Sequence, residues 1–169
     1  FLVLGAGLIG ALTALRLSQS NYKVLVVDKK SQPKKDSRTL AVNANSKDFL
    51  EQLGLWKKLQ SCPEPINKIK ISDSSHTSPL VFENDDEPMG NVILNYELLS
   101  SAKEALMKKK ILFYNTDLAL KDILENKVTH LNNKKYSFKH AVLCLGKNYI
   151  NKTIINKYTF VNDHKSYVG

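Results

Sequence analysis

The feature that most constrains this chain is a glycine-rich loop between a short apolar run and a helical pattern. Residues 1–4 are apolar, as in a buried parallel strand, and the next six residues read Gly-Ala-Gly-Leu-Ile-Gly. Gly5 permits a tight turn out of the strand, and Gly7 lets the backbone approach a diphosphate because no Cβ intervenes. Gly10 allows the helix to pack closely on the strand. The first 20 residues therefore predict a strand, a phosphate-binding turn and a helix.

The residues around this loop favour a dinucleotide as its ligand. The backbone N–H groups of Gly7, Leu8 and Ile9 begin the helix, whose positive end suits a diphosphate. A second apolar run over residues 23–28 ends in Asp28, which can accept hydrogen bonds from ribose hydroxyls and would repel a 2′-phosphate. We therefore expect FAD or NAD(H); a purely structural glycine turn followed by a chance Asp is the alternative.

Apolar periodicity predicts an α/β fold class for the whole chain. Prolines and period-2 alternation between residues 61 and 94 favour antiparallel strands, whereas continuous apolar runs elsewhere favour buried parallel ones. The elements expected after residue 28 are helices over residues 46–53 and 97–108 and strands over residues 66–71, 80–82, 91–94, 111–114, 118–124, 127–131, 135–138 and 141–145. The expected architecture is a Rossmann-like parallel sheet with a small antiparallel subdomain that begins near residue 61.

The net charge of +9 raises the question of nucleic-acid binding. Nearly all of the excess lies in residues 103–169, and all of the 25 basic residues except Arg16 and Arg38 are Lys. Recognition of phosphates and bases by planar, bidentate groups favours Arg. We therefore expect a solvated basic surface and no nucleic-acid partner, with attraction to an anionic membrane surface as the alternative.

The cysteines and histidines indicate no metal site. Cys62 and Cys144 are far apart, which excludes a disulfide scaffold and fits a reducing compartment; Cys144 is expected to be an inert core thiol. The four histidines show no metal-ligand spacing.

No apolar run approaches the roughly 18 residues of a membrane span, so we expect a cytoplasmic protein, with peripheral association at the inner membrane as the alternative. The chain begins inside a strand and is expected to be part of a longer protein.

Two further segments carry a resemblance to a known family. Residues 36–42 read DSRTLAV and residues 49–56 read FLEQLGLW. Together with the glycine loop, they resemble the UbiH-type hydroxylases of ubiquinone biosynthesis, which are class A flavin monooxygenases with the p-hydroxybenzoate hydroxylase fold. The resemblance covers about residues 1–145. It implies FAD as cofactor, NAD(P)H as reductant, and hydroxylation of a prenylated phenol with O₂. It also implies two alternative partners, a ubiquinone-synthesis complex or the membrane surface.

The resemblance also implies roles for individual residues and segments. Arg38 matches an arginine that lies over the phosphate and ribose of the flavin nucleotide, where a guanidinium can pair with the diphosphate. The implied domains are a discontinuous FAD-binding domain at residues 1–60 and 95–150, substrate-binding strands at residues 61–94 and an incomplete tail at residues 151–169. No catalytic side chain is expected, because the chemistry belongs to the flavin. The resemblance implies an FAD-dependent monooxygenase, of which residues 1–169 alone are expected to be inactive.

The segment from Cys144 to Lys152 departs from the family pattern. Members typically carry Ala-Asp-Gly-x-x-Ser-x-x-Arg here, whereas this chain keeps only Gly146 and has Leu145, Tyr149 and Lys152 in place of the Asp, Ser and Arg. This departure favours one alternative, a degenerate, non-catalytic dinucleotide-binding module. An NAD-dependent oxidoreductase is the other alternative, and the short strands expected between residues 117 and 138 argue against it.

Overall fold

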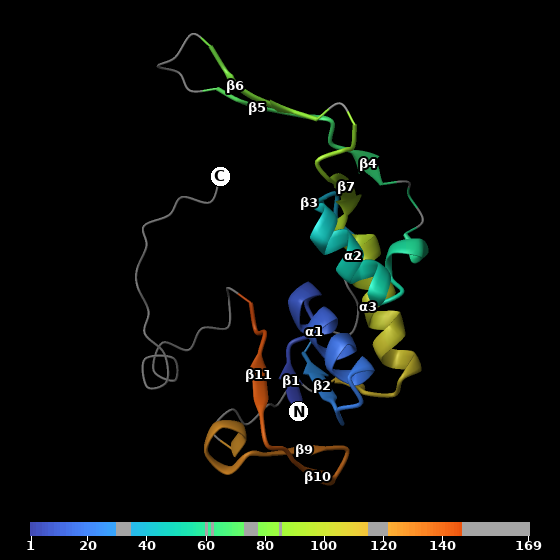
Figure 1. Cartoon of the computed structure of the whole chain (residues 1–169). Helices are drawn as coiled ribbons and strands as arrows, with labels where there is room; N and C mark the ends of the chain where they lie inside the picture. The colour runs from blue at the N-terminus through green and yellow to red at the C-terminus, as the bar shows by residue number, and fades with distance from the viewer. Residues whose placement is uncertain are drawn as a thin grey trace.

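The computed structural model describes residues 1–29, 35–59, 61, 63–72, 78–84, 86–114 and 122–146 (Figure 1). Its main sheet has four parallel strands in the order β11-β1-β2-β8. These strands are Leu2–Leu4 (β1), Leu25–Asp28 (β2), Leu112–Tyr114 (β8) and Ala141–Leu143 (β11). Leu2 lies opposite Leu25 on one side and Ala141 on the other, so β1 is an inner strand. The predicted Rossmann-like parallel sheet is confirmed.

Helices cover one face of this sheet. Helix α1 (Leu8–Gln19) and helix α3 (Asn95–Lys108) pack side by side against the alternate side chains of β1 and β2. Val3 and Val26 point to this side, and the helices meet them with small or aliphatic residues. The fully buried members contributed by the two helices are Ala11, Ala14, Leu98, Ala102 and Leu106. The small side chains of α1 allow its close approach to the strands, as the sequence predicts.

A β-hairpin covers the opposite face. Leu2, Leu4 and Val27 point away from the helices and pack with Ile123 and Leu131. Leu131 ends β9 (Val128–Leu131), which pairs antiparallel with β10 (Lys134–Ser137). The turn between them is made by two asparagines with positive φ, as a two-residue hairpin requires. The inner strands β1 and β2 are thus covered on both faces, which explains their continuous apolar runs.

The strand predicted over residues 118–124 is wrong where it can be checked. Residues 118–121 lie outside the described residues, and Asp122–Asn126 forms a π-helical turn. Ile123, in this turn, is 1% exposed and fills the space beneath the sheet. Ile123 is therefore buried by a single helical turn, and residues 122–124 form no paired strand despite their period-2 pattern.

A separate three-stranded antiparallel sheet has the order β3-β7-β4. It contains Thr39–Val42 (β3), Glu64–Pro65 (β4) and Asn91–Leu94 (β7). Antiparallel pairing in the region after residue 61 is confirmed, but β3 comes from before that point and was not predicted. Its four residues alternate between exposed and buried too briefly to stand out in the sequence. The domain limits at residues 60, 95 and 150 stay predictions, and the tail at 151–169 lies outside the described residues.

Strands Lys68–Ile71 (β5) and Leu80–Glu83 (β6) form an antiparallel hairpin that extends away from both sheets (Figure 1). All eight of these residues are exposed.

The remaining helix, α2 (Ala44–Gln52), begins two residues earlier than expected, because the Asn43 side chain accepts a hydrogen bond from the Ser46 N–H (2.9 Å). It ends at Gln52, and Gly54, directly after the cap residue Leu53, has a φ of 68°, which fits the predicted C-terminal capping glycine. A 3₁₀ turn over Trp56–Lys58 follows.

Candidate functional site

The glycine loop lies at the carboxyl edge of the parallel sheet, between the end of β1 and the start of α1. Gly5 has φ of 94°, and its N–H donates to the Val27 carbonyl of the neighbouring strand (2.7 Å). A Cβ at Gly5 would overlap the Cys144 carbonyl oxygen, and a Cβ at Gly10 would overlap the Gly5 carbonyl oxygen. Gly5 and Gly10 are therefore required by the packing of the loop itself.

Gly7 has a different role from the other two glycines. It is exposed, its φ of −65° is open to any residue, and a Cβ built on it would have no other atom within 4 Å. It is also the N-terminal cap of α1, and the first turn of this helix has no acidic residue. The space beside Gly7 is thus open to an incoming anion, with the N–H groups of Leu8 and Ile9 at the positive end of the helix. This arrangement fits a diphosphate.

Asp28 ends β2 next to the loop, and its side chain is 15% exposed. Its Oδ2 accepts a hydrogen bond from the Ala6 N–H (2.6 Å). The same oxygen lies 3.8 Å from the Nζ of Lys103, a residue of α3. The structure therefore brings the predicted acid and the glycine loop together, and it adds a buried lysine.

Tyr114 is a further neighbour of Asp28. The two residues lie opposite each other in the β2–β8 pair, and the Lys103 Nζ is 6.0 Å from the Tyr114 ring centroid. Burial, and secondarily the Asp28 charge, raises the pKa of Tyr114. Sequence reasoning missed both Lys103 and Tyr114. A usable signal for Lys103 was its position beside Ala102 and one turn before Leu106, on the apolar face of the predicted helix.

Arg38 is not brought to the glycine loop by any contact of the described residues. Its guanidinium is exposed and pairs with Asp36, with Nη2 at 2.6 Å and Nε at 2.9 Å from Oδ2. The hydrogen bond from Arg38 lowers the pKa of Asp36. The Arg38 carbonyl accepts from the Asn95 N–H at the start of α3 (2.9 Å). Its role at a diphosphate stays a prediction.

The segment after β11 is described only as far as Gly146, so Tyr149 and Lys152 lie outside the described residues. Cys144 is half-buried, its N–H donates to the Leu4 carbonyl (2.7 Å), and burial raises the pKa of its thiol. A neutral thiol is a poor nucleophile, in agreement with the expectation of an inert residue.

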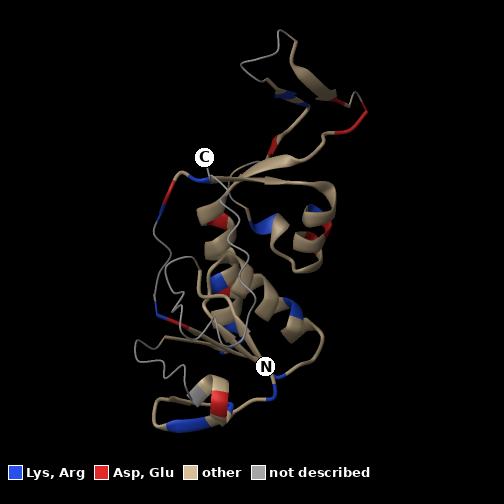
Figure 2. Cartoon of the chain, turned by 90° about the vertical axis from the view of Figure 1, so that its left-hand side faces the viewer, with Lys and Arg blue, Asp and Glu red and all other residues tan. Residues whose placement is uncertain are grey.

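Within the described ranges, no group of three or more His, Cys, Asp or Glu side chains is arranged to hold a metal ion. No helix in this part of the chain is long and apolar enough to cross a membrane. Lys and Arg are spread over several elements and interspersed with Asp and Glu (Figure 2). The expectation of no nucleic-acid partner stays a prediction.

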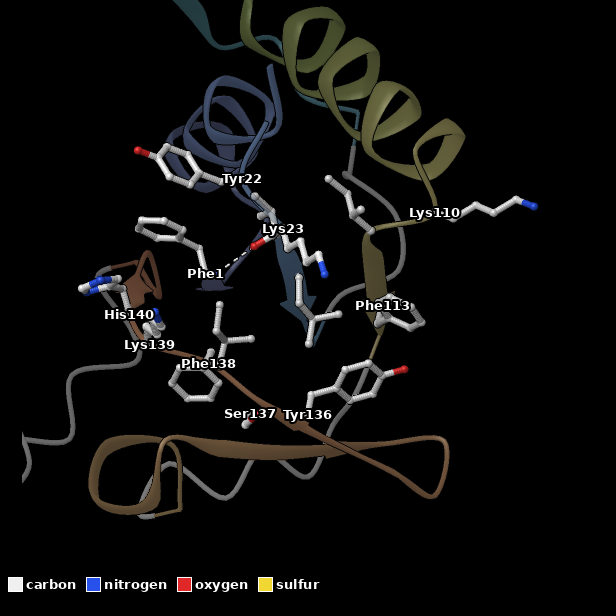
Figure 3. A pocket seen from close by; sticks show the side chains of 14 residues that line it. Phe1, Tyr22, Lys23, Lys110, Phe113, Tyr136, Ser137, Phe138, Lys139 and His140 are labelled. Carbon is white, nitrogen blue, oxygen red and sulfur yellow. Dashed lines mark hydrogen bonds between the residues drawn. The ribbon is translucent and has the colours of Figure 1, made fainter. Parts of the chain in front are cut away.

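A hollow of the described surface lies at the other edge of the sheet (Figure 3). It has a volume of about 1020 Å³ and is lined by residues that precede the parallel strands, among them Phe1, Val24, Ile111 and His140. Ligands of open parallel sheets bind outside the carboxyl ends of the strands. The glycine loop, at that end, is therefore the stronger candidate site.

Comparison with known proteins gives a family for this arrangement. A family model described as "FAD binding domain" matches residues 1–135. A curated relative, ubiquinone hydroxylase UbiM from Neisseria meningitidis, is 28% identical over 138 residues, which are 72% of this chain and 29% of the relative.

Solved structures share the fold at low sequence identity. FqzB superposes with a TM-score of 0.68 and 13% identity, over 92% of this chain and 38% of FqzB. CtdE, solved in complex with FAD and a substrate, gives a TM-score of 0.61 and 15% identity, over 84% of this chain and 36% of CtdE. The chain thus spans about a third of the length of the proteins it matches.

Proposed function

Since the chain belongs to the FAD-binding domain family, we propose that it is the flavin-binding part of an FAD-dependent monooxygenase that hydroxylates an aromatic ring. The observation that carries the proposal is the open glycine loop beside Asp28 at the carboxyl edge of the sheet, in a chain of this family. The family match favours FAD over NAD as the dinucleotide at this loop.

The residues present fit the adenosine and diphosphate end of FAD. Gly5 and Gly10 hold the loop in shape, and Gly7 gives the diphosphate access to the N–H groups of Leu8 and Ile9. The Asp28 carboxylate binds the ribose hydroxyls. Arg38, after leaving Asp36, pairs with the diphosphate.

Bound FAD supplies the redox chemistry: it takes electrons from NAD(P)H and activates O₂. The side chains named above bind and orient the cofactor, and none of them is proposed to transfer a proton to the substrate.

The proposed substrate is a prenylated phenol of ubiquinone biosynthesis. The support is the relative from Neisseria meningitidis, which is a ubiquinone hydroxylase. A prenylated substrate partitions into membranes, so peripheral association with the inner membrane, or with a ubiquinone-synthesis complex in the cytoplasm, belongs to the same proposal.

A second candidate function is a non-catalytic flavin-binding module. The observation in its favour is the segment from Cys144 to Lys152, where only Gly146 of the usual flavin motif is kept. Such a module would bind FAD through the same glycine loop but would not be reduced by NAD(P)H.

Two measurements test these functions. The purified protein should show the visible absorption bands of oxidised flavin, and an NAD-dependent enzyme would show none. Under anaerobic conditions NADH or NADPH should bleach these bands in the full-length protein. With O₂ the full-length protein should add one oxygen atom to a prenylated phenol, as measured by mass spectrometry, whereas residues 1–169 alone should not. Bound flavin that neither reductant bleaches would support the non-catalytic module, and a protein without flavin affinity would refute both functions.

A further inference from the structure

We propose that Lys103 is a positioning residue that fixes the Asp28 carboxylate for the ribose hydroxyls of FAD. The inference rests on the proposed role of Asp28. It adds a residue of helix α3 to the site, and the glycine motif does not predict any site residue on this helix.

The first observation is the burial of a lysine. The Lys103 side chain is 6% exposed, whereas Lys108 on the same helix is 70% exposed and pairs with Glu104. Burying an ammonium group is costly unless an opposite charge lies close to it. The carboxylate of Asp28, 3.8 Å from Nζ, provides that charge. The Lys103 ammonium group is thus stabilised by the Asp28 carboxylate more than by solvent.

The second observation is the way the carboxylate is held. The Ala6 N–H and the Lys103 Nζ both approach Oδ2, one from the glycine loop and one from α3. The hydrogen bond from Ala6 and the electrostatic attraction of Lys103 both act on this oxygen, and together they restrict the rotation of the short Asp28 side chain. A carboxylate that is already oriented loses less conformational entropy when the ribose binds.

The third observation concerns charge. Asp28 lies beside the loop that would receive a diphosphate, so its negative charge opposes that anion. The ammonium of Lys103 offsets this charge at short range in a poorly solvated environment, where screening by salt is weak. Lys103 therefore lets an acid and a diphosphate occupy neighbouring positions.

A double-mutant cycle on FAD affinity tests the proposal. Lys103→Met keeps the aliphatic length and removes the charge, and Asp28→Asn keeps the shape and removes the other charge. We expect each single variant to weaken FAD binding about tenfold, and the double variant to bind no worse than Asp28→Asn. Lys103→Arg should stay within about threefold of the unmodified protein, because it keeps the positive charge. Lys108→Met, the matched change at the exposed position, should have no effect.

A second readout separates positioning from mere stability. FAD that lacks the adenosine 2′-hydroxyl has lost a group that Asp28 binds, so the loss of affinity caused by Lys103→Met should shrink with this analogue. A purely structural lysine would give the same loss with both cofactors. The double variant removes both charges, so it keeps the test usable if Lys103→Met alone does not fold.

The outcomes distinguish this inference from the proposed function. If Asp28→Asn weakens FAD binding but Lys103→Met does not, the positioning role is refuted while the FAD site stands. The positioning role is also refuted if the loss caused by Lys103→Met persists in full in the Asp28→Asn background. If Asp28→Asn leaves FAD affinity unchanged, the ribose role of Asp28 is itself refuted.

Discussion

The parallel sheet and the β5–β6 hairpin use similar apolar residues in opposite ways. Leu2, Val3 and Leu4 of β1 are fully buried between the helices and the β9–β10 hairpin. In the β5–β6 hairpin, Ile71 and Leu80 face each other across the strands and are 55% and 58% exposed. The comparison shows that the edge carrying the glycine loop is held by packing, whereas the hairpin is held mainly by its own strand pairing. Substitutions in the parallel sheet should therefore lower the free energy of unfolding or FAD affinity strongly, whereas substitutions in the hairpin should change both only slightly.

The largest effect is expected for Gly10→Val. The new Cβ would overlap the Gly5 carbonyl oxygen and lie 3.0 Å from the Cys144 Cβ, so α1 could not stay in its place on the sheet. Overpacking against backbone should reduce the free energy of unfolding by about 3 kcal/mol or more. Urea denaturation followed by circular dichroism measures this, and an unfolding midpoint equal to that of the unmodified protein would contradict the packing role of Gly10.

Gly7→Val should separate binding from folding. A Cβ at Gly7 has no atom within 4 Å beyond its chain neighbours, so the unfolding midpoint should change little, but the branched side chain would occupy the space of the diphosphate. We expect FAD binding to be abolished in a folded protein, as measured by quenching of flavin fluorescence. Gly7→Ala is the milder control and should weaken binding less. Unchanged affinity in folded Gly7→Val would remove the loop from the site.

Asp28→Ala should weaken FAD binding by at least about tenfold. Its carboxylate is expected to accept charge-assisted hydrogen bonds from the ribose, each worth about 1.5–3 kcal/mol, and tenfold corresponds to about 1.4 kcal/mol. Because the change also leaves Lys103 buried without its acid, the stability of the cofactor-free protein must be measured alongside. Glu104→Ala, which removes an exposed acid of α3, is the control and should leave affinity unchanged.

The sequence predicted the glycine loop, the parallel strands and Asp28 because local patterns determine them. A tight turn needs glycine, and a strand buried on both faces must be continuously apolar. The same reasoning did not find Lys103 or Tyr114, because their proximity to Asp28 depends on how α3 and β8 pack, across more than 70 residues of sequence. It also missed β3, which is a strand only because β7 pairs with it. The strand expected over residues 118–124 was wrong at residues 122–124, because apolar alternation does not reveal whether a partner strand is present.

The smallest effect is expected for Leu80→Ala in the hairpin. Leu80 is 58% exposed, so truncation removes little buried surface and leaves no cavity, and the free energy of unfolding should fall by less than about 1 kcal/mol. The same truncation at Leu106 of α3, which is fully buried, should cost about 2–5 kcal/mol because the transfer and cavity costs add. FAD affinity should be unchanged in Leu80→Ala, since the hairpin extends away from the sheet that carries the glycine loop (Figure 1). Denaturation of both variants in parallel measures the difference. Equal losses would mean that the hairpin is packed against apolar surface in solution, and the contrast between the two regions would then disappear.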